Sequence, residues 1–190
     1  MKISKRFVNL KFILFLIFSL ATFQVLADGC NFSIDATATA PSLQLELTNG
    51  EDSEVVEDLK TGLMWARCYN GSDWDISLTD CSTTGDSKFT WKEALKLVDD
   101  ANNSAYLGFT DWRLPNIKEL ASIVERRCYT PAINVDRFPL SGLSSAGVFW
   151  SSTPVTGGTS IRVISFAYGR MSSSDITIGN YVRLVRDATP

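Results

Sequence analysis

The sequence predicts an α+β domain built on an antiparallel sheet. Helix-type patterns come first, between about residues 90 and 125, and strand-type patterns follow from about residue 141. The two types do not alternate, as they would in a parallel βαβ fold. Residues 28–190 also form a stretch of the length expected for one domain with a core of its own.

Residues 1–27 have the layout of a secretory signal peptide. Four basic residues come first, an apolar run from Phe12 to Leu20 follows, and small Ala27 precedes the expected cleavage point. A retained membrane anchor is the alternative, but the uncharged stretch is shorter than the roughly 20 residues that span a bilayer. Lipidation of Cys30 is disfavoured by Asp28. We expect an exported protein, in the periplasm, on the cell surface or in the medium, without a transmembrane segment after cleavage.

Removal of the signal peptide makes the chain more acidic. The whole sequence has a formal net charge of −3, and the signal holds four of its 18 basic residues and none of its 21 acidic ones. The remaining chain therefore carries −7, which argues against nucleic acid as a partner.

All four cysteines lie beyond the signal peptide, which predicts two disulfides in an oxidising compartment. Three connectivities are possible. Cys68 with Cys81 is favoured because both flank one polar loop, which leaves Cys30 for Cys128. The spacings match no zinc pattern and the chain contains no histidine, so we expect no metal site and no cofactor.

The first part of the exported chain is less regular. Residues 28–54 form a leader with one possible strand around Leu45, and residues 55–190 form the domain proper. Thr61-Gly62 predicts a turn before a strand at Leu63–Arg67. Asn70–Lys88 is a polar, aspartate-rich loop whose spacing does not complete a calcium loop.

Two helices have recognisable start signals. Thr90 and Glu93 form a capping-box pattern, and apolar residues then follow at helical spacing. These are Trp91, Ala94, Leu95, Val98 and Ala101. The second helix is expected to begin after Leu114-Pro115, with Asn116 as its cap and Glu119 three residues later.

The last third of the chain is rich in strand-forming residues. Three runs are separated by glycine-containing turns, at Val148–Thr153, Ser160–Tyr168 and Tyr181–Arg186.

Six short motifs, in order, resemble those of a known bacterial family. They are Thr61-Gly62-Leu63-Met64-Trp65, Thr90-Trp91-Lys92-Glu93-Ala94-Leu95, Asp111-Trp112-Arg113-Leu114-Pro115-Asn116-Ile117-Lys118-Glu119-Leu120, Pro131-Ala132-Ile133-Asn134, Phe149-Trp150-Ser151-Ser152-Thr153 and Tyr181-Val182-Arg183-Leu184-Val185-Arg186. Over about residues 55–187 the chain is similar to the family named after the C-terminal domain of a Legionella collagen-like adhesin.

This resemblance implies a C-type-lectin-like fold, with two helices flanking an antiparallel sheet and long irregular loops. It also implies binding of sulfated polysaccharides and a role in attachment. The chain departs from the best-known member in lacking a Gly-X-Y collagen repeat. It also lacks the Glu-Pro-Asn and Gln-Pro-Asp motifs of calcium-dependent lectins. Its acidic charge disfavours a polyanion unless several arginines share one face. These are Arg126, Arg127, Arg137, Arg162 and Arg170.

The candidate ligand-binding residues are Trp74, Arg126, Arg127 and Arg137, which lie in predicted loops. Trp74 stands in the polar loop and is expected to be exposed, whereas the other four tryptophans are expected to pack in the core. These are Trp65, Trp91, Trp112 and Trp150. Asp111, Arg113, Arg183 and Arg186 are better explained as carboxylate–guanidinium pairs that fix the helix entry than as ligand contacts.

Two functions remain from the sequence. The first is a non-catalytic binding module for a polysaccharide, a surface glycan or a protein partner. The second is a structural or assembly component of the bacterial envelope that docks on another protein. We expect no enzyme, because the cysteines are assigned to disulfides and no acid–base constellation stands out.

Overall fold

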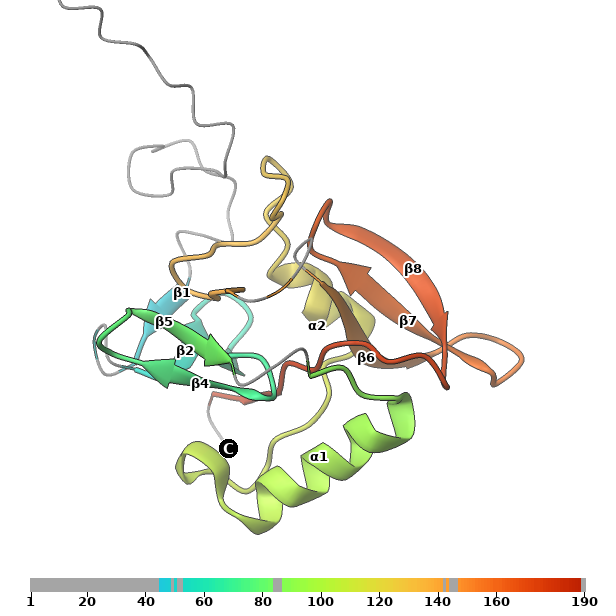
Figure 1. Cartoon of the computed structure of the whole chain (residues 1–190), viewed down its shortest axis with the longest axis horizontal. Helices are drawn as coiled ribbons and strands as arrows, with labels where there is room; N and C mark the ends of the chain where they lie inside the picture. Colours follow the sequence, from blue (N-terminus) through green and yellow to red (C-terminus); the bar gives the residue numbers. More distant parts are fainter. Residues whose placement is uncertain are drawn as a thin grey trace, which may run out of the picture.

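The computed structural model describes residues 45–48, 50, 53–83, 87–141, 143 and 147–188. Within this part the predicted α+β class is confirmed, with two α-helices and three antiparallel sheets (Figure 1). The signal peptide and most of the leader lie outside the described residues. In chain order the elements are β1 (Leu45–Leu47), β2 (Val55–Asp58), β3 (Leu63–Ala66), β4 (Ser72–Asp75), β5 (Asp80–Thr83), α1 (Trp91–Asn103), the short 3₁₀ helix η1 (Tyr106–Gly108), α2 (Ile117–Ser122), β6 (Val148–Pro154), β7 (Ser160–Ser165), β8 (Arg170–Asp175) and β9 (Val185–Asp187).

The first sheet joins the two ends of the described chain. Its strand order is β1-β2-β3-β9, so the C-terminal strand lies beside β3. The strand expected within the leader is β1, which pairs with β2, and its Leu45 is buried in the core. The predicted strand at Tyr181–Arg186 is shorter than expected, because only its last residues enter the sheet as β9.

The aspartate-rich segment contains a β-hairpin where the sequence predicts a loop. β4 and β5 pair with each other alone and form the second sheet. The predicted Cys68–Cys81 disulfide is confirmed, with an S–S distance of 2.10 Å, and it attaches the hairpin to the end of β3. Cys128 is also disulfide-bonded. Its expected partner, Cys30, lies outside the described residues.

Both helices begin where their caps predict. The Thr90 hydroxyl and the Glu93 carboxylate form a reciprocal capping box at α1. Asn116 and Glu119 do the same at α2. The buried side of α1 differs from the expectation at one position, since Leu95 is 40% exposed while Ala94 and Ala101 are buried.

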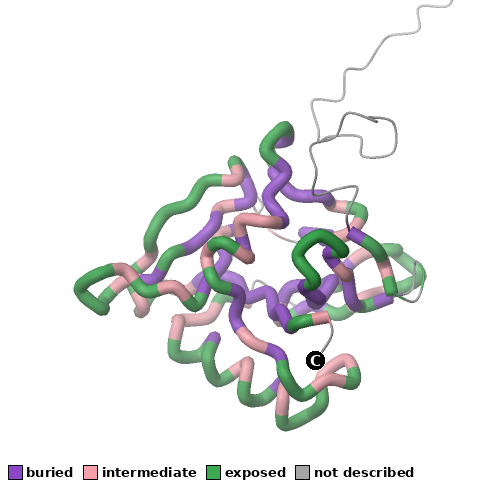
Figure 2. Tube along the Cα trace, turned by 180° about the vertical axis from the view of Figure 1, so that it is seen from behind, coloured by how far each residue is buried: buried purple, intermediate pink, exposed green. Residues whose placement is uncertain are grey.

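The third sheet, β6-β7-β8, separates two apolar clusters. Successive residues of a strand point to opposite faces. Accordingly, Phe149 and Ile164 belong to one cluster with Leu120 of α2. Their strand neighbours Trp150 and Val163 belong to the other cluster with Ala94 of α1. The two helices thus pack against opposite faces of this sheet, while β8 and the outer side of α1 are largely exposed (Figure 2).

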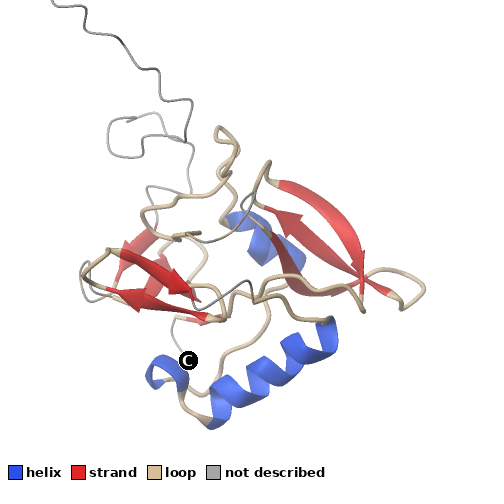
Figure 3. Cartoon of the chain, viewed as in Figure 1, coloured by secondary structure: helices blue, strands red, loops and turns tan. Residues whose placement is uncertain are grey.

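Three of the four tryptophans expected in the core are fully buried, namely Trp65, Trp112 and Trp150. Trp91 is half-buried, and its indole N–H donates to the Ser151 carbonyl at 3.4 Å. Loop segments connect most of these elements, and the longest path between regular elements runs from α2 to β6 (Figure 3).

Candidate functional site

The four residues selected from the sequence fall into two groups. Arg126 and Arg127 are exposed in the turn after α2. Arg137 is half-buried, and its Nε donates to the Leu45 carbonyl at 3.3 Å, so it helps to hold β1. Trp74 is connected to the same region, because Arg67 stacks on its ring. Arg67 also donates to the backbone carbonyl of Asp136, the residue before Arg137.

Trp74 is half-buried rather than fully open. The guanidinium of buried Arg67 stacks on its ring, with Cζ 3.4 Å from the ring centroid. A cation desolvated against an aromatic face is attracted by the ring quadrupole. This stack fixes the hairpin on the body of the domain, and one face of the indole is thereby occupied within the chain.

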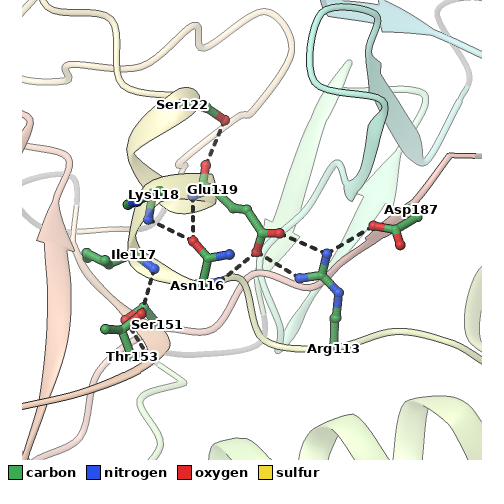
Figure 4. Close-up of polar contacts among 9 residues, drawn as sticks. All are labelled: Arg113, Asn116, Ile117, Lys118, Glu119, Ser122, Ser151, Thr153 and Asp187. Carbon is green, nitrogen blue, oxygen red and sulfur yellow. Dashed lines mark hydrogen bonds and ion pairs between the residues drawn. The ribbon is translucent and has the colours of Figure 1, made fainter.

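Of the charged residues that the sequence assigns to carboxylate–guanidinium pairs, Arg183 is the exception, because it donates to backbone carbonyls and not to a carboxylate. The others form such pairs. Arg186 binds both carboxylate oxygens of Asp111, at 2.7 and 3.1 Å. Arg113 makes a bidentate contact with Glu119, at 2.8 and 2.9 Å, and reaches Asp187 at 3.1 Å (Figure 4). Glu119 and then Asp187 raise the pKa of Arg113, and Arg186 lowers the pKa of Asp111. These pairs tie the helix entry to β9.

Asn116→Ala is expected to lower the free energy of unfolding by about 1 kcal/mol, within the range measured for helix caps. The Asn116 side chain accepts hydrogen bonds from the backbone N–H groups of Lys118 and Glu119, at 2.9 and 3.0 Å. α2 has six residues and depends strongly on this cap. Urea unfolding measures the effect. Asn103→Ala, at an exposed position of α1, is the control, and an equal loss in both variants would contradict the assignment.

A concave surface lies where the segment after α2 meets the β7–β8 turn. The backbone N–H of Thr130 donates to the Ala167 carbonyl, and that of Ala132 donates to the Phe166 carbonyl, both at 2.6 Å. The two segments lie side by side at the top of Figure 1. Gly169 permits this contact, because a Cβ there would approach Val124 Cγ1 to 2.5 Å.

Two exposed tyrosines stand on these segments. Tyr129 is 65% exposed and Tyr168 is 63% exposed. Arg170 lies beside Tyr168, with Cζ 5.6 Å from the ring centroid. Large aromatic side chains that remain exposed on a rigid scaffold are typical of ligand contacts.

The first cavity of this surface, called here the basic cavity, has a volume of about 390 Å³. Its lining includes Lys88, Thr130, Ser165, Tyr168 and Asn180. Of the described residues that line it, Lys88 alone is charged, and its ammonium lies 5.3 Å from the centroid of the Tyr181 ring. The basic cavity can therefore take an anionic or hydroxyl-bearing group.

The second cavity, called here the acidic cavity, has a volume of about 470 Å³ and shares Thr130 with the first. Its charged lining residues are Asp80 and Asp136, joined by the hydroxyl-bearing Thr79 and Ser141 and by an apolar floor. Asp80 is held in place because it accepts hydrogen bonds from the Cys81 backbone N–H at 2.7 Å and from the Ser141 hydroxyl. Cavities with an apolar lining and a few fixed polar groups are the usual form of small-ligand sites.

Sequence reasoning missed most of this surface. Tyr129, Tyr168, Lys88 and Thr130 were not selected, because they come from segments far apart in the chain. The one local signal is the pair of tyrosines at turn positions, where nothing in the sequence requires a large aromatic side chain.

The described residues include neither a metal-binding cluster nor a membrane-spanning helix. No group of three or more Asp, Glu, Cys or His side chains that could hold a metal ion occurs in this part of the chain. None of the helices there is both long enough and apolar enough to cross a membrane.

One protein family matches most of the described chain. The model of the Lcl C-terminal domain, the domain of a Legionella collagen-like protein, matches residues 54–186. This range includes both helices, all three sheets except β1 and Asp187, and every residue named above as lining the two cavities. The match indicates no catalytic family. No curated protein matches the chain.

Proposed function

The chain belongs to the Lcl C-terminal domain family, and on that premise we propose that it is an exported, non-catalytic module that binds a polysaccharide or surface glycan in adhesion. The observation that carries the proposal is the pair of adjoining cavities at Thr130, flanked by exposed Tyr129 and Tyr168. Two cavities that share a lining residue suit a polymer with successive units better than a single small molecule.

The chemistry of the surface supports a saccharide ligand. The two linings contain the hydroxyls of Thr79, Thr130 and Ser141 and the amide of Asn180. The Thr79 and Ser141 hydroxyls donate within the chain, and their oxygens can still accept hydrogen bonds from a ligand. Tyrosine rings offer apolar faces with a polar tip, which suits the mixed surface of a sugar. Lys88 lines the basic cavity, Arg170 lies beside Tyr168, and Arg126 and Arg127 are exposed in the turn after α2. These positive charges include acidic sugars among the ligands.

Two finer features belong to the same proposal. The helices on opposite faces of the β6-β7-β8 sheet and the long loops support a C-type-lectin-like architecture. The Cys68–Cys81 disulfide is consistent with a location outside the cytoplasm, in the periplasm, on the surface or in the medium.

Titration of the oxidised chain from Asp28 to Pro190 against heparin and neutral polysaccharides tests the proposal. Tyr168→Ala and Arg170→Ala are each expected to weaken binding by roughly fivefold or more, since truncation of a central aromatic or arginine contact costs more than 1 kcal/mol. Binding of heparin should also weaken with added salt, because exposed charges are screened. Arg126→Ala/Arg127→Ala should reduce that salt dependence.

Leu59→Ala and Lys60→Ala are the matched controls, because both residues are exposed in the β2–β3 turn, away from the two cavities. They should bind as the unmodified chain does. If no polysaccharide binds, the proposal fails, and an envelope component that docks on another protein becomes the better explanation. Equal weakening in the control variants would remove the surface at Thr130 as the site.

A further inference from the structure

The two cavities carry charge of opposite sign although they share a wall at Thr130. Lys88 is the charged residue in the lining of one, and Asp80 and Asp136 are the charged residues in the lining of the other. A purely anionic polymer would place negative groups beside both carboxylates. Like charges brought together in this way oppose binding.

The fold holds one carboxylate of the acidic cavity by hydrogen bonds and fixes the backbone that carries the other. Asp80 accepts the Cys81 N–H and the Ser141 hydroxyl, and the Ser141 carbonyl is in turn bound by the Tyr69 hydroxyl at 2.9 Å. The Asp136 backbone is fixed on both sides, by its N–H to the Asn134 side chain at 3.0 Å and by its carbonyl to Arg67 at 3.2 Å. A site fixed before the ligand arrives loses less entropy on binding.

We propose that the polymer bound at this surface carries a free amine next to an anionic group, with the amine in the acidic cavity and the anion beside Lys88. This inference rests on the proposed polysaccharide function and narrows it to a zwitterionic saccharide. An ammonium group offers three hydrogen-bond donors and one positive charge, which matches two carboxylates and two hydroxyls.

Three forms of one polymer test the inference: heparin, N-desulfated heparin with its amines free, and N-desulfated heparin with the same amines acetylated. Binding is measured at mildly acidic pH, where the amine is protonated. The free-amine form is expected to bind roughly three- to tenfold more tightly than the acetylated form. The reason is that an ion pair in a partly enclosed site contributes more to binding than an ion pair exposed to solvent. Nonspecific attraction predicts the reverse order, because the free amines reduce the negative charge of the polymer.

Asp136→Asn keeps the shape of the side chain and removes its charge, so the ratio of the two affinities should fall towards one. Asp99→Asn, on the exposed side of α1, is the control and should keep the ratio. Equal or tighter binding of the acetylated form overturns the inference while the polysaccharide function stands. Absence of binding by all three forms and by neutral polysaccharides overturns the function itself, so the two failures are distinguishable.

Discussion

Arg183→Ala is expected to lower the free energy of unfolding by about 3–5 kcal/mol, the range for removal of a large or charged buried side chain. Arg183 is fully buried, and its Nη1 donates to the carbonyls of Ala66 and Arg67 at the end of β3. Its guanidinium carbon lies 4.8 Å from the centroid of the Phe138 ring. Truncation would leave two carbonyls without this donor and a void against an aromatic ring.

The charge of Arg183 acts against the stability that its contacts provide. Burial lowers the pKa of the guanidinium, and among the described residues no acceptor is within hydrogen-bond distance of Nε and Nη2. Arg183→Met, which fills much of the same volume without charge, should therefore cost clearly less than Arg183→Ala. Urea unfolding of both variants checks this, with exposed Arg162→Ala as the control. A loss under 1 kcal/mol for Arg183→Ala would contradict the assigned role.

The parts of the fold that follow local rules were predictable. Both capping boxes depend on residues three apart, so Thr90 with Glu93 and Asn116 with Glu119 could be recognised directly. β6 and β7 contain β-branched and aromatic residues and were also found. β8 was missed, because its three consecutive serines have little strand preference and it is held by six register pairs with β7.

The β4–β5 hairpin and Trp74 show a second limit of prediction from the sequence. Asp, Ser and Thr dominate β4 and β5, so the sequence favoured a loop, and the disulfide and the Arg67–Trp74 stack hold a strand pair there. Trp74 was expected to be exposed because its sequence neighbours are polar. Burial depends on neighbours in space, and the neighbour that covers it is an arginine at the end of β3.

The candidate site was predictable only in part for the same reason. The exposure of Arg126 and Arg127 could be predicted, because both lie in a turn. The arrangement of acidic and hydroxyl side chains around Thr130 could not be predicted from the sequence. The acidic cavity combines the β4–β5 turn with the segment from Thr130 to Leu143. No local sequence pattern shows that these two segments meet. The predicted pairing of Cys68 with Cys81 gives part of the answer, because it fixes the position of the hairpin.

Removal of the Cys68–Cys81 disulfide is expected to lower the free energy of unfolding by about 3 kcal/mol, the chain-entropy value for a loop of this size. The two cysteines are 13 residues apart, and their bond closes the hairpin on the domain. The double variant Cys68→Ala/Cys81→Ala is the appropriate test, because a reducing agent would also act on the disulfide of Cys128. Urea unfolding under oxidising conditions measures the loss.

The same variant connects stability to the site. Asp80 precedes Cys81 and forms one wall of the acidic cavity, so loosening the hairpin should weaken the preference for a free amine as well as the fold. Ser77→Ala/Ser82→Ala, which removes exposed hydroxyls from the same hairpin, controls for local side-chain loss. A destabilisation below about 1 kcal/mol would mean that noncovalent contacts, among them the Arg67–Trp74 stack and the Ser141–Asp80 hydrogen bond, suffice to hold the hairpin in place. The acidic cavity would then depend on these contacts rather than on a covalent bond.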